Sequence, residues 1–139
     1  MHYVRSIAAV AAVAILITAP RISFAAESSG RQDFIQNCAG CHGADGKGHG
    51  EQAYLIANAN AKVPDLTMLS KSNGGKFPTR RVYKSIDGRN GIPSHERFDM
   101  PFWGTEFQPE GQEFTRASNS QVKKRIMRIV DYIKTIQQQ

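Results

Sequence analysis

The sequence is poor in cysteine and in long apolar runs, and both shortages narrow its possible architecture. Only two cysteines, Cys38 and Cys41, occur among 139 residues, so no cysteine is left for a second, separate role. The longest apolar stretch, Ile7–Ala19, is shorter than the roughly 20 residues with which a helix crosses a bilayer. The chain also lacks internal repeats, linkers and low-complexity segments. We therefore expect a single domain with one core.

Residues 1–25 have the pattern of a Sec signal peptide. A basic start precedes the apolar stretch Ile7–Ala19, and the small residues Ser23 and Ala25 stand at the −3 and −1 positions of a cleavage site. No cysteine follows as in a lipoprotein, and no twin-arginine pair is present. We expect cleavage after Ala25, export to the periplasm and a mature domain of residues 26–139. The alternative is an uncleaved anchor.

The positive net charge does not indicate a nucleic-acid-binding protein. The whole chain carries +6, and removing Arg5 and Arg21 with the signal leaves +4. One basic cluster is predicted to lie on the solvent-exposed face of the last helix, which is the ordinary place for such a run. It consists of Lys123, Lys124, Arg125 and Arg128.

The two cysteines belong to the run Cys38-Ala39-Gly40-Cys41-His42. This spacing is the attachment signature of c-type haem. Two thiols on one helical turn each add to a haem vinyl group, and the histidine that follows binds the iron. A thioredoxin-like pair would need an alternation of strands and helices that the sequence lacks. Half of a zinc site or a short structural disulfide would also use two cysteines, and haem is favoured over all three.

The periodicity of apolar residues predicts an all-α domain. The clearest element is the last helix, where apolar residues recur at three- and four-residue steps after a cap at Ser118, Asn119 or Ser120. They are Val122, Ile126, Ile129, Val130, Ile133 and Ile136. The final three glutamines are expected to fray. Earlier helical segments are predicted at Gly30–Ala39, Glu51–Ala61, Asp65–Lys71 and Thr79–Ile86, the last with Thr79 as N-cap and Gly88 as its stop. Between Gly88 and Gly111 no periodicity is visible.

Met100 is the predicted second iron ligand. It lies in a loop rich in glycine and proline, far along the chain from His42, and Pro101 stiffens that loop. The competing ligands are Met68, Met127, His49 and His95. Histidine and methionine together fill the coordination sphere and leave no vacancy for a substrate, which favours electron transfer over catalysis.

The chain resembles the class I c-type cytochromes, in the small bacterial periplasmic monohaem branch. Gly30, Phe34 and Cys38 stand four residues apart, as do the helix-crossing glycine, the aromatic residue and the first haem cysteine of that family. Ile129 and Tyr132 match the apolar–aromatic pair of its C-terminal helix. The resemblance implies a compact all-α fold with crossing N- and C-terminal helices, wrapped around one covalent haem c.

The resemblance also implies roles for three further residues. The carbonyl of Pro64 is the candidate to hold Nδ1–H of the proximal histidine. Tyr83 is expected to donate to the methionine sulfur, and Trp103 or an arginine to meet a haem propionate. The interval between His42 and Pro64 is longer than in compact members of the family.

The function implied is that of a periplasmic single-electron carrier, monomeric or in transient complexes with redox protein partners. The alternatives are a haem-bearing relay subunit of a periplasmic dehydrogenase or oxidase, and a ligand-binding or peroxidatic haem protein. We expect no nucleic-acid partner and no stable membrane insertion after cleavage. Four basic residues are predicted to form a weak positive rim that steers an acidic partner to the haem edge. They are Lys47, Lys62, Arg89 and Arg97.

Overall fold

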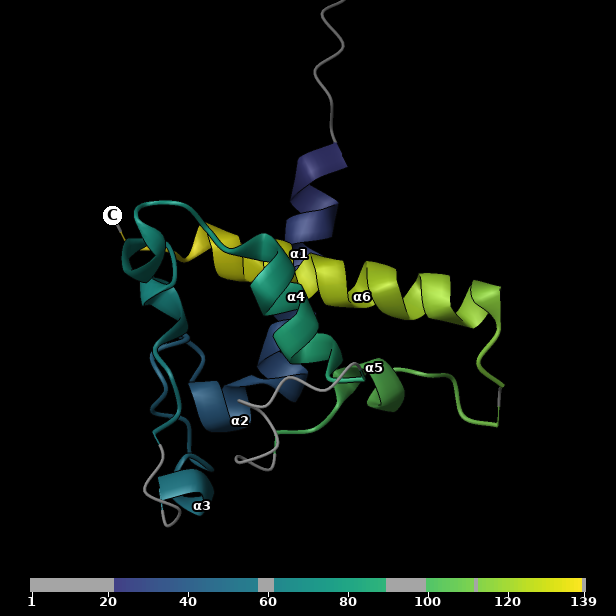
Figure 1. The fold of residues 1–139 in the computed structure, drawn as a ribbon, viewed down its shortest axis with the longest axis horizontal. Coiled ribbons are helices and arrows are strands. Elements are labelled where there is room, and N and C mark those ends of the chain that lie inside the picture. The colour runs from purple at the N-terminus through teal and green to yellow at the C-terminus, as the bar shows by residue number, and fades with distance from the viewer. Residues whose placement is uncertain (1–21, 58–61, 90–99, 112, 139) are drawn as a thin grey trace, which may run out of the picture.

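The computed structural model describes residues 22–57, 62–89, 100–111 and 113–138. Within these ranges the chain forms helices and turns and no strand, which confirms the all-α prediction (Figure 1). Most of the predicted signal peptide, residues 1–21, lies outside the described residues. In the same ranges no helix combines the length and apolarity that a membrane crossing requires.

The helices nearest the two ends of the chain cross and form the most extensive helix–helix contact. They are α1 (Ile22–Asn37) and α6 (Arg116–Thr135), and Figure 1 shows α6 running across α1. Gly30 lies at the contact, where a Cβ atom would overlap the carbonyl oxygen of Arg128. One turn further along α1, the rings of Phe34 and Tyr132 pack with their centroids 5.2 Å apart. The crossing anticipated from Gly30, Phe34 and Tyr132 is therefore present.

The predicted apolar stripe of α6 forms the core. Val122, Ile126, Ile129, Val130 and Ile133 are all buried, and Tyr132 beside them is only 8% exposed. The last member of the stripe, Ile136, is the C-cap of α6 and is half-buried. The stripe packs against Phe34 of α1 and against residues of α4. Burial of these side chains is the main favourable contribution to folding.

An ionic cluster flanks the crossing. The buried carboxylate of Asp33 accepts from Nε of Arg125 at 2.9 Å and from Nη2 of Arg128 at 3.1 Å. The Arg125 guanidinium also lies 3.9 Å from the centroid of the Phe107 ring. The predicted solvent-exposed basic cluster of α6 is therefore only half correct, because two of its four members are half-buried and hold Asp33.

The cap predicted for α6 is wrong by three residues or more. The helix begins at Arg116, and Thr115 is its N-cap: the hydroxyl of Thr115 accepts from the amide of Ser118, whose hydroxyl accepts from the amide of Thr115. This reciprocal arrangement is a capping box with serine in place of the usual glutamate or glutamine. Ser118 thus belongs to the first turn of the helix.

Short elements connect the two long helices. They are α2 (Ala39–His42), α3 (Tyr54–Ala57), the 3-10 turns η1 (Leu66–Met68) and η2 (Lys71–Asn73), α4 (Thr79–Asp87) and α5 (Trp103–Glu106). The predicted N-cap of α4 is wrong by one residue, because Pro78 is the N-cap and Thr79 is the first helical residue. The predicted stop is confirmed, because Gly88 ends α4 in the left-handed conformation. Helix α5 was not predicted from the sequence pattern.

The first described helix and the C-terminal glutamines differ from expectation. The first helix begins at Ile22, eight residues before the predicted start at Gly30. At the other end, Gln137 and Gln138 are hydrogen-bonded to the segment 66–70. The expectation of a frayed end is therefore wrong for these two glutamines.

Candidate functional site

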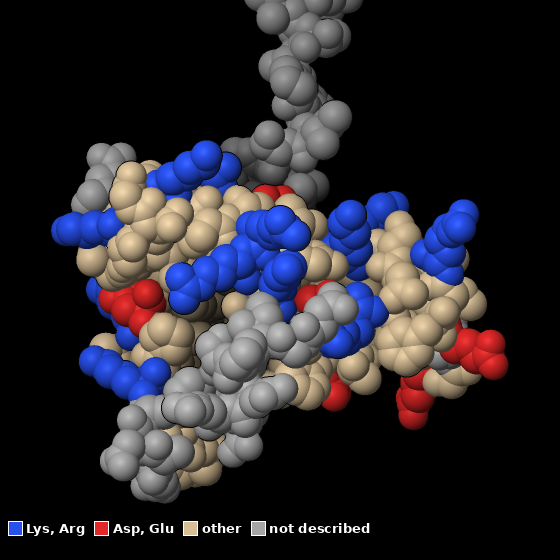
Figure 2. Space-filling view, in the orientation of Figure 1, with Lys and Arg blue, Asp and Glu red and all other residues tan. Residues whose placement is uncertain are grey.

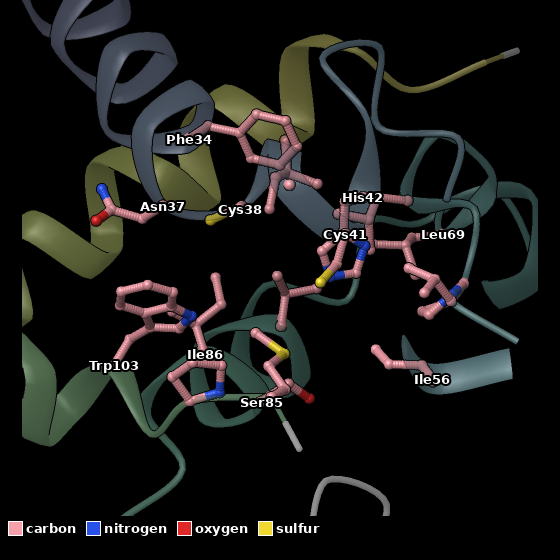
Figure 3. Close-up of a pocket in the computed structure, with 18 of the residues that line it drawn as sticks. Phe34, Asn37, Cys38, Cys41, His42, Ile56, Leu69, Ser85, Ile86 and Trp103 are labelled. Atoms are coloured by element: carbon pink, nitrogen blue, oxygen red, sulfur yellow. The ribbon is translucent and has the colours of Figure 1, made fainter. Parts of the chain in front are cut away.

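A cavity of about 490 Å³ opens between α1, α2, α4, α5 and the segment around η1. Its volume is in the range usual for small-molecule and cofactor sites. The sulfur-bearing residues Cys38, Cys41 and Met100 line it together with His42. Figure 3 shows Cys38, Cys41 and His42 on the wall formed by the end of α1 and by α2, with Trp103 and Ile86 across the opening. Most of the remaining lining residues are apolar: Phe34, Ile56, Val63, Pro64, Leu66, Leu69, Pro78, Val82, Pro101 and Ile133.

The backbone of the Cys-x-x-Cys-His run explains how three reactive side chains reach one wall. The amide of Cys38 still donates to the carbonyl of Phe34 in α1, and the amide of His42 donates to the carbonyl of Cys38 at 2.9 Å. Cys38 and His42 are therefore one helical turn apart, with Cys41 beside them. Gly43, at φ 77°, then leaves the helix in a conformation that favours glycine.

The environment of Cys38 suits a thioether better than a thiolate. Burial raises the pKa of its thiol to about 12, and the carboxylate of Asp33 and the sulfur of Cys41 contribute to the rise. A charged sulfur at this place is therefore disfavoured. A thioether is neutral, so bonding of Cys38 to a haem vinyl group removes the ionisable group from the buried site.

Met100 is the only one of the predicted or competing sixth ligands within the described residues that lines the cavity. Met127 lies instead on another face of α6 beside Lys123 and Lys124. Met68 in η1 and the exposed His49 are not among the lining residues. His95 lies outside the described residues. The assignment of His42 and Met100 to the iron stays a prediction that this arrangement supports.

Pro64 and Trp103 line the same cavity as His42. Gly48 lies between the haem motif and the segment around Pro64. Its amide donates to the carbonyl of His42 at 2.7 Å, and its Cα packs against the carbonyl of Val63. A side chain at Gly48 would overlap that carbonyl, so only glycine permits this approach. The indole of Trp103 packs on Phe107, with centroids 5.0 Å apart.

Tyr83 is not among the cavity-lining residues and packs against the core. Burial raises the pKa of its phenol and the carboxylate of Asp87 raises it further, while Arg89 opposes both. Its predicted hydrogen bond to the methionine sulfur stays untested.

Two cations, Lys62 and Arg81, stand on the cavity wall. Lys62 was predicted as part of the basic rim, whereas Arg81 was not predicted as a site residue. A haem brings two propionates, whose negative charges these side chains would complement. The signal for Arg81 was present, because Pro78, Arg81, Val82 and Ser85 follow the three- and four-residue steps of one helix face.

The competing uses of the cysteines find no support among the described residues. Cys38 and Cys41 are not joined by a disulfide there, and no three His, Cys, Asp or Glu side chains gather as a metal site would require. The cavity instead offers two attachment sulfurs, a histidine beside them, an apolar lining and two cations. This set of residues fits a covalently bound haem.

The comparisons with known proteins agree with this geometry. The family model described as Cytochrome c matches residues 28–137, which is most of the chain. The comparisons with curated proteins and with solved structures gave no match. The matched range includes both haem cysteines, the packed parts of the crossing helices and every described residue of the cavity wall. The chain therefore belongs to the cytochrome c family of electron-transfer proteins, and it binds haem c covalently through Cys38 and Cys41.

Proposed function

We propose that this cytochrome is a periplasmic carrier of single electrons, with His42 and Met100 as the axial ligands of its iron. The observation that carries the proposal is the presence of Met100 on the same cavity as the Cys-x-x-Cys-His run. The haem iron supplies the chemistry by taking up and releasing one electron. The protein supplies two fixed ligands and an apolar enclosure.

Filling both axial positions explains why a carrier is favoured over an enzyme. Strong ligands on both faces leave no position at which a substrate or dioxygen binds. The cavity wall is mostly apolar and keeps water from the cofactor, which limits rearrangement when an electron arrives. Methionine sulfur also favours ferrous iron and raises the reduction potential.

The ligand assignment is tested by Met100→Ala with Met68→Ala as its matched control. The first change should remove the sulfur–iron charge-transfer band of the ferric protein, lower the midpoint potential and open the iron to carbon monoxide. Met68 does not line the cavity, so its replacement should leave all three unchanged. The opposite pattern would show that Met68 is the ligand.

Covalent attachment is tested separately from ligation. Acid–acetone extraction of the wild-type protein should leave the colour with the polypeptide, because thioether bonds survive it. Cys38→Ala should give a single, weaker attachment or prevent maturation. Haem that passes freely into the solvent from the wild-type protein would contradict attachment at Cys38 and Cys41.

The proposed partners are redox proteins with an acidic docking surface. Figure 2 shows basic side chains across the middle of one face, over the region that α4 occupies in Figure 1. Arg80 and Lys84 of α4 are exposed and make no ion pair in the described part of the chain. Their charges are therefore available to an acidic partner.

The four residues predicted as a basic rim lie in different settings. Lys62 lines the cavity, and Lys47 is exposed. Arg89 is instead bound to Asp87, and Arg97 lies outside the described residues. The proposed docking surface thus depends more on α4 than on this rim.

Charge reversal on α4 tests the docking surface. Exposed charges act over about 10 Å at 0.1 M salt, so electron transfer to an acidic partner should slow as salt rises. Arg80→Glu with Lys84→Glu should slow it at low salt and flatten the salt dependence. Lys123→Glu with Lys124→Glu changes the net charge equally on α6, away from the cavity, and should have a much smaller effect.

A permanent relay subunit would behave differently. Such a subunit should co-elute with a large dehydrogenase or oxidase and show flat kinetics across a salt series. A ligand-binding or peroxidatic haem protein should bind carbon monoxide without any substitution.

Periplasmic export is tested by cell fractionation with N-terminal sequencing, where an intact residue 1 would contradict cleavage after Ala25.

A further inference from the structure

The carboxamide of Gln137, one residue beyond the C-cap of α6, joins two parts of the cavity wall. Its Nε2 donates to the carbonyl of Leu66 at 2.7 Å and to the carbonyl of Ile133 at 2.8 Å. Its Oε1 accepts from the amide of Ser70 at 2.8 Å. Both hydrogens and the oxygen of this half-buried side chain are therefore engaged with backbone.

These bonds close a segment that has little regular structure of its own. Leu66 opens the 3-10 turn η1 and Ser70 follows it, so the carboxamide spans the turn from end to end. The amide of Gln138 adds a parallel bond to the carbonyl of Thr67 at 2.8 Å. Short 3-10 turns have poor internal hydrogen bonds, so outside partners contribute much of their order.

The same segment forms the wall of the cavity on the histidine side. Leu66 and Leu69 both line the cavity, and Figure 3 shows Leu69 beside His42. Ile133, the third partner of the carboxamide, lines the cavity from α6. Gln137 thus links an apolar wall residue of the long helix to the turn that carries two others.

We propose that Gln137 is a positioning residue that holds the Leu66–Ser70 segment, called here the η1 wall, against the histidine face of the haem. By holding this wall closed it keeps water from the iron and so raises the reduction potential. The inference requires only the covalent haem at Cys38 and Cys41. It is independent of whether Met100 binds the iron and of whether the protein is a carrier or a relay.

The direction of the effect follows from charge. Ferric haem carries one more positive charge than ferrous haem, and contact with water stabilises the more charged state. A loosened η1 wall admits water and favours the ferric state. Loss of the carboxamide should therefore lower the midpoint potential.

The test compares Gln137→Ala with Gln138→Ala in the full-length holoprotein. The second change removes an exposed side chain but keeps the backbone amide that bonds to Thr67, so it is a matched control. In Gln137→Ala we expect at least tenfold faster hydrogen exchange at the Ser70 amide and a lower midpoint potential. The control should match the wild type in both measurements.

Gln137→Glu separates the donor from the acceptor function and covers the case in which the alanine variant folds poorly. A carboxylate keeps the acceptor for Ser70 but cannot donate to Leu66 or Ile133. Because the negative charge of a carboxylate would by itself lower the potential, this variant is measured in acid, where the protonated side chain is neutral and offers one donor for the two carbonyls. There its midpoint potential should still lie below that of the wild type at the same pH. A wild-type potential in Gln137→Ala, or in the neutral acid form of Gln137→Glu, would overturn the proposal, as would an effect of equal size in the control. Failure of Met100→Ala to alter the spectrum would refute the ligand assignment and leave this result untouched.

Discussion

The helix crossing and the cavity wall are built in different ways from the same chain. At the crossing, Ile126 and Ile129 have no exposed surface, and two long helices supply most of the packing. The cavity wall comes mostly from short helices, 3-10 turns and loops. Its order depends on individual hydrogen bonds such as those of Gln137 and Gly48. The first region is held by apolar packing and the second by polar contacts to backbone.

Because of this difference, we expect the two regions to control different properties: the crossing the free energy of unfolding, and the cavity wall the spectrum and reduction potential of the haem. Substitutions at the crossing should change the free energy of unfolding and leave the haem spectrum of the folded protein unchanged. Substitutions on the cavity wall should change the spectrum or the potential with smaller effects on stability. The variants of Met100 and Gln137 described above test the cavity wall, and four further substitutions outside it test the effects on stability, beginning with the largest expected change.

Truncation of Tyr132 should have the largest effect at the crossing. Tyr132→Ala removes a buried ring that packs on Phe34, which typically costs about 3 kcal/mol or more of unfolding free energy. Denaturant titration of the holoprotein measures the loss. Tyr54→Ala is the matched control, because Tyr54 is 63% exposed and should change stability by less than about 0.5 kcal/mol. Equal losses in the two variants would contradict the crossing.

A methyl group at Gly30 should destabilise the protein by forcing the helices apart. The new Cβ overlaps the carbonyl of Arg128, and overpacking of this kind costs about 1–3 kcal/mol. The intrinsic helix propensity of alanine works in the opposite direction, by up to about 1 kcal/mol. Thermal unfolding of Gly30→Ala should therefore show a net loss. Arg31→Ala, at the exposed neighbouring position of α1, should show almost none.

Loss of the Asp33 carboxylate should have a smaller effect. Asp33→Asn keeps the shape of the side chain but leaves Arg125 and Arg128 without their anionic partner. Because both arginine side chains are more than a third exposed, we expect about 1–2 kcal/mol rather than the value for a fully buried pair. Asp131→Asn, at an exposed position of α6, is the control. If Asp33→Asn lowered the free energy of unfolding as much as Tyr132→Ala, the crossing would be stabilised mainly by its ion pairs rather than by apolar packing.

The smallest expected effect concerns Tyr83 and appears only in alkali. Burial and Asp87 raise the pKa of its phenol above the ordinary value near 10. The unfolded chain therefore loses this proton first, and the stability contribution present below about pH 10 is lost as pH rises through the folded-state pKa. Tyr83→Phe should remove that decline, as measured by unfolding at a series of pH values. We expect its charge-transfer band to match the wild type, because Tyr83 does not line the cavity.

The crossing was predictable because its signals are local and repeated. Gly30, Phe34 and Cys38 recur at four-residue steps, and the stripe of α6 continues through about three turns of the helix. Apolar periodicity of that length fixes which face of a helix is buried. The haem attachment site was equally predictable, since the spacing of the Cys-x-x-Cys-His run alone specifies the attachment chemistry.

The missed features depend on partners far along the chain. Helix α5 lies in a segment without periodicity, and Gly104 within it is required by contact with Asp87 and Arg89 rather than by any local pattern. Arg89 was expected at the basic rim, but it also bonds to Asn119, thirty positions away. From the sequence alone Gln137 is predicted to fray, because its partner Ser70 lies 67 positions away and becomes its neighbour only in the folded chain.

The crossing of α1 and α6 also has a consequence for chain length. Asp33 and Arg125 are 92 positions apart, so docking of the end helices closes a loop that contains almost every other element. The entropy of that closure grows with the logarithm of loop length, and each doubling of a flexible loop adds only about 0.6 kcal/mol. An insertion at the exposed turn Gly74–Gly75, where a Cβ atom on either glycine would meet nothing within 4 Å, should therefore cost little. Such a chain has room to lengthen its connecting loops while the crossing and the haem motif stay unchanged.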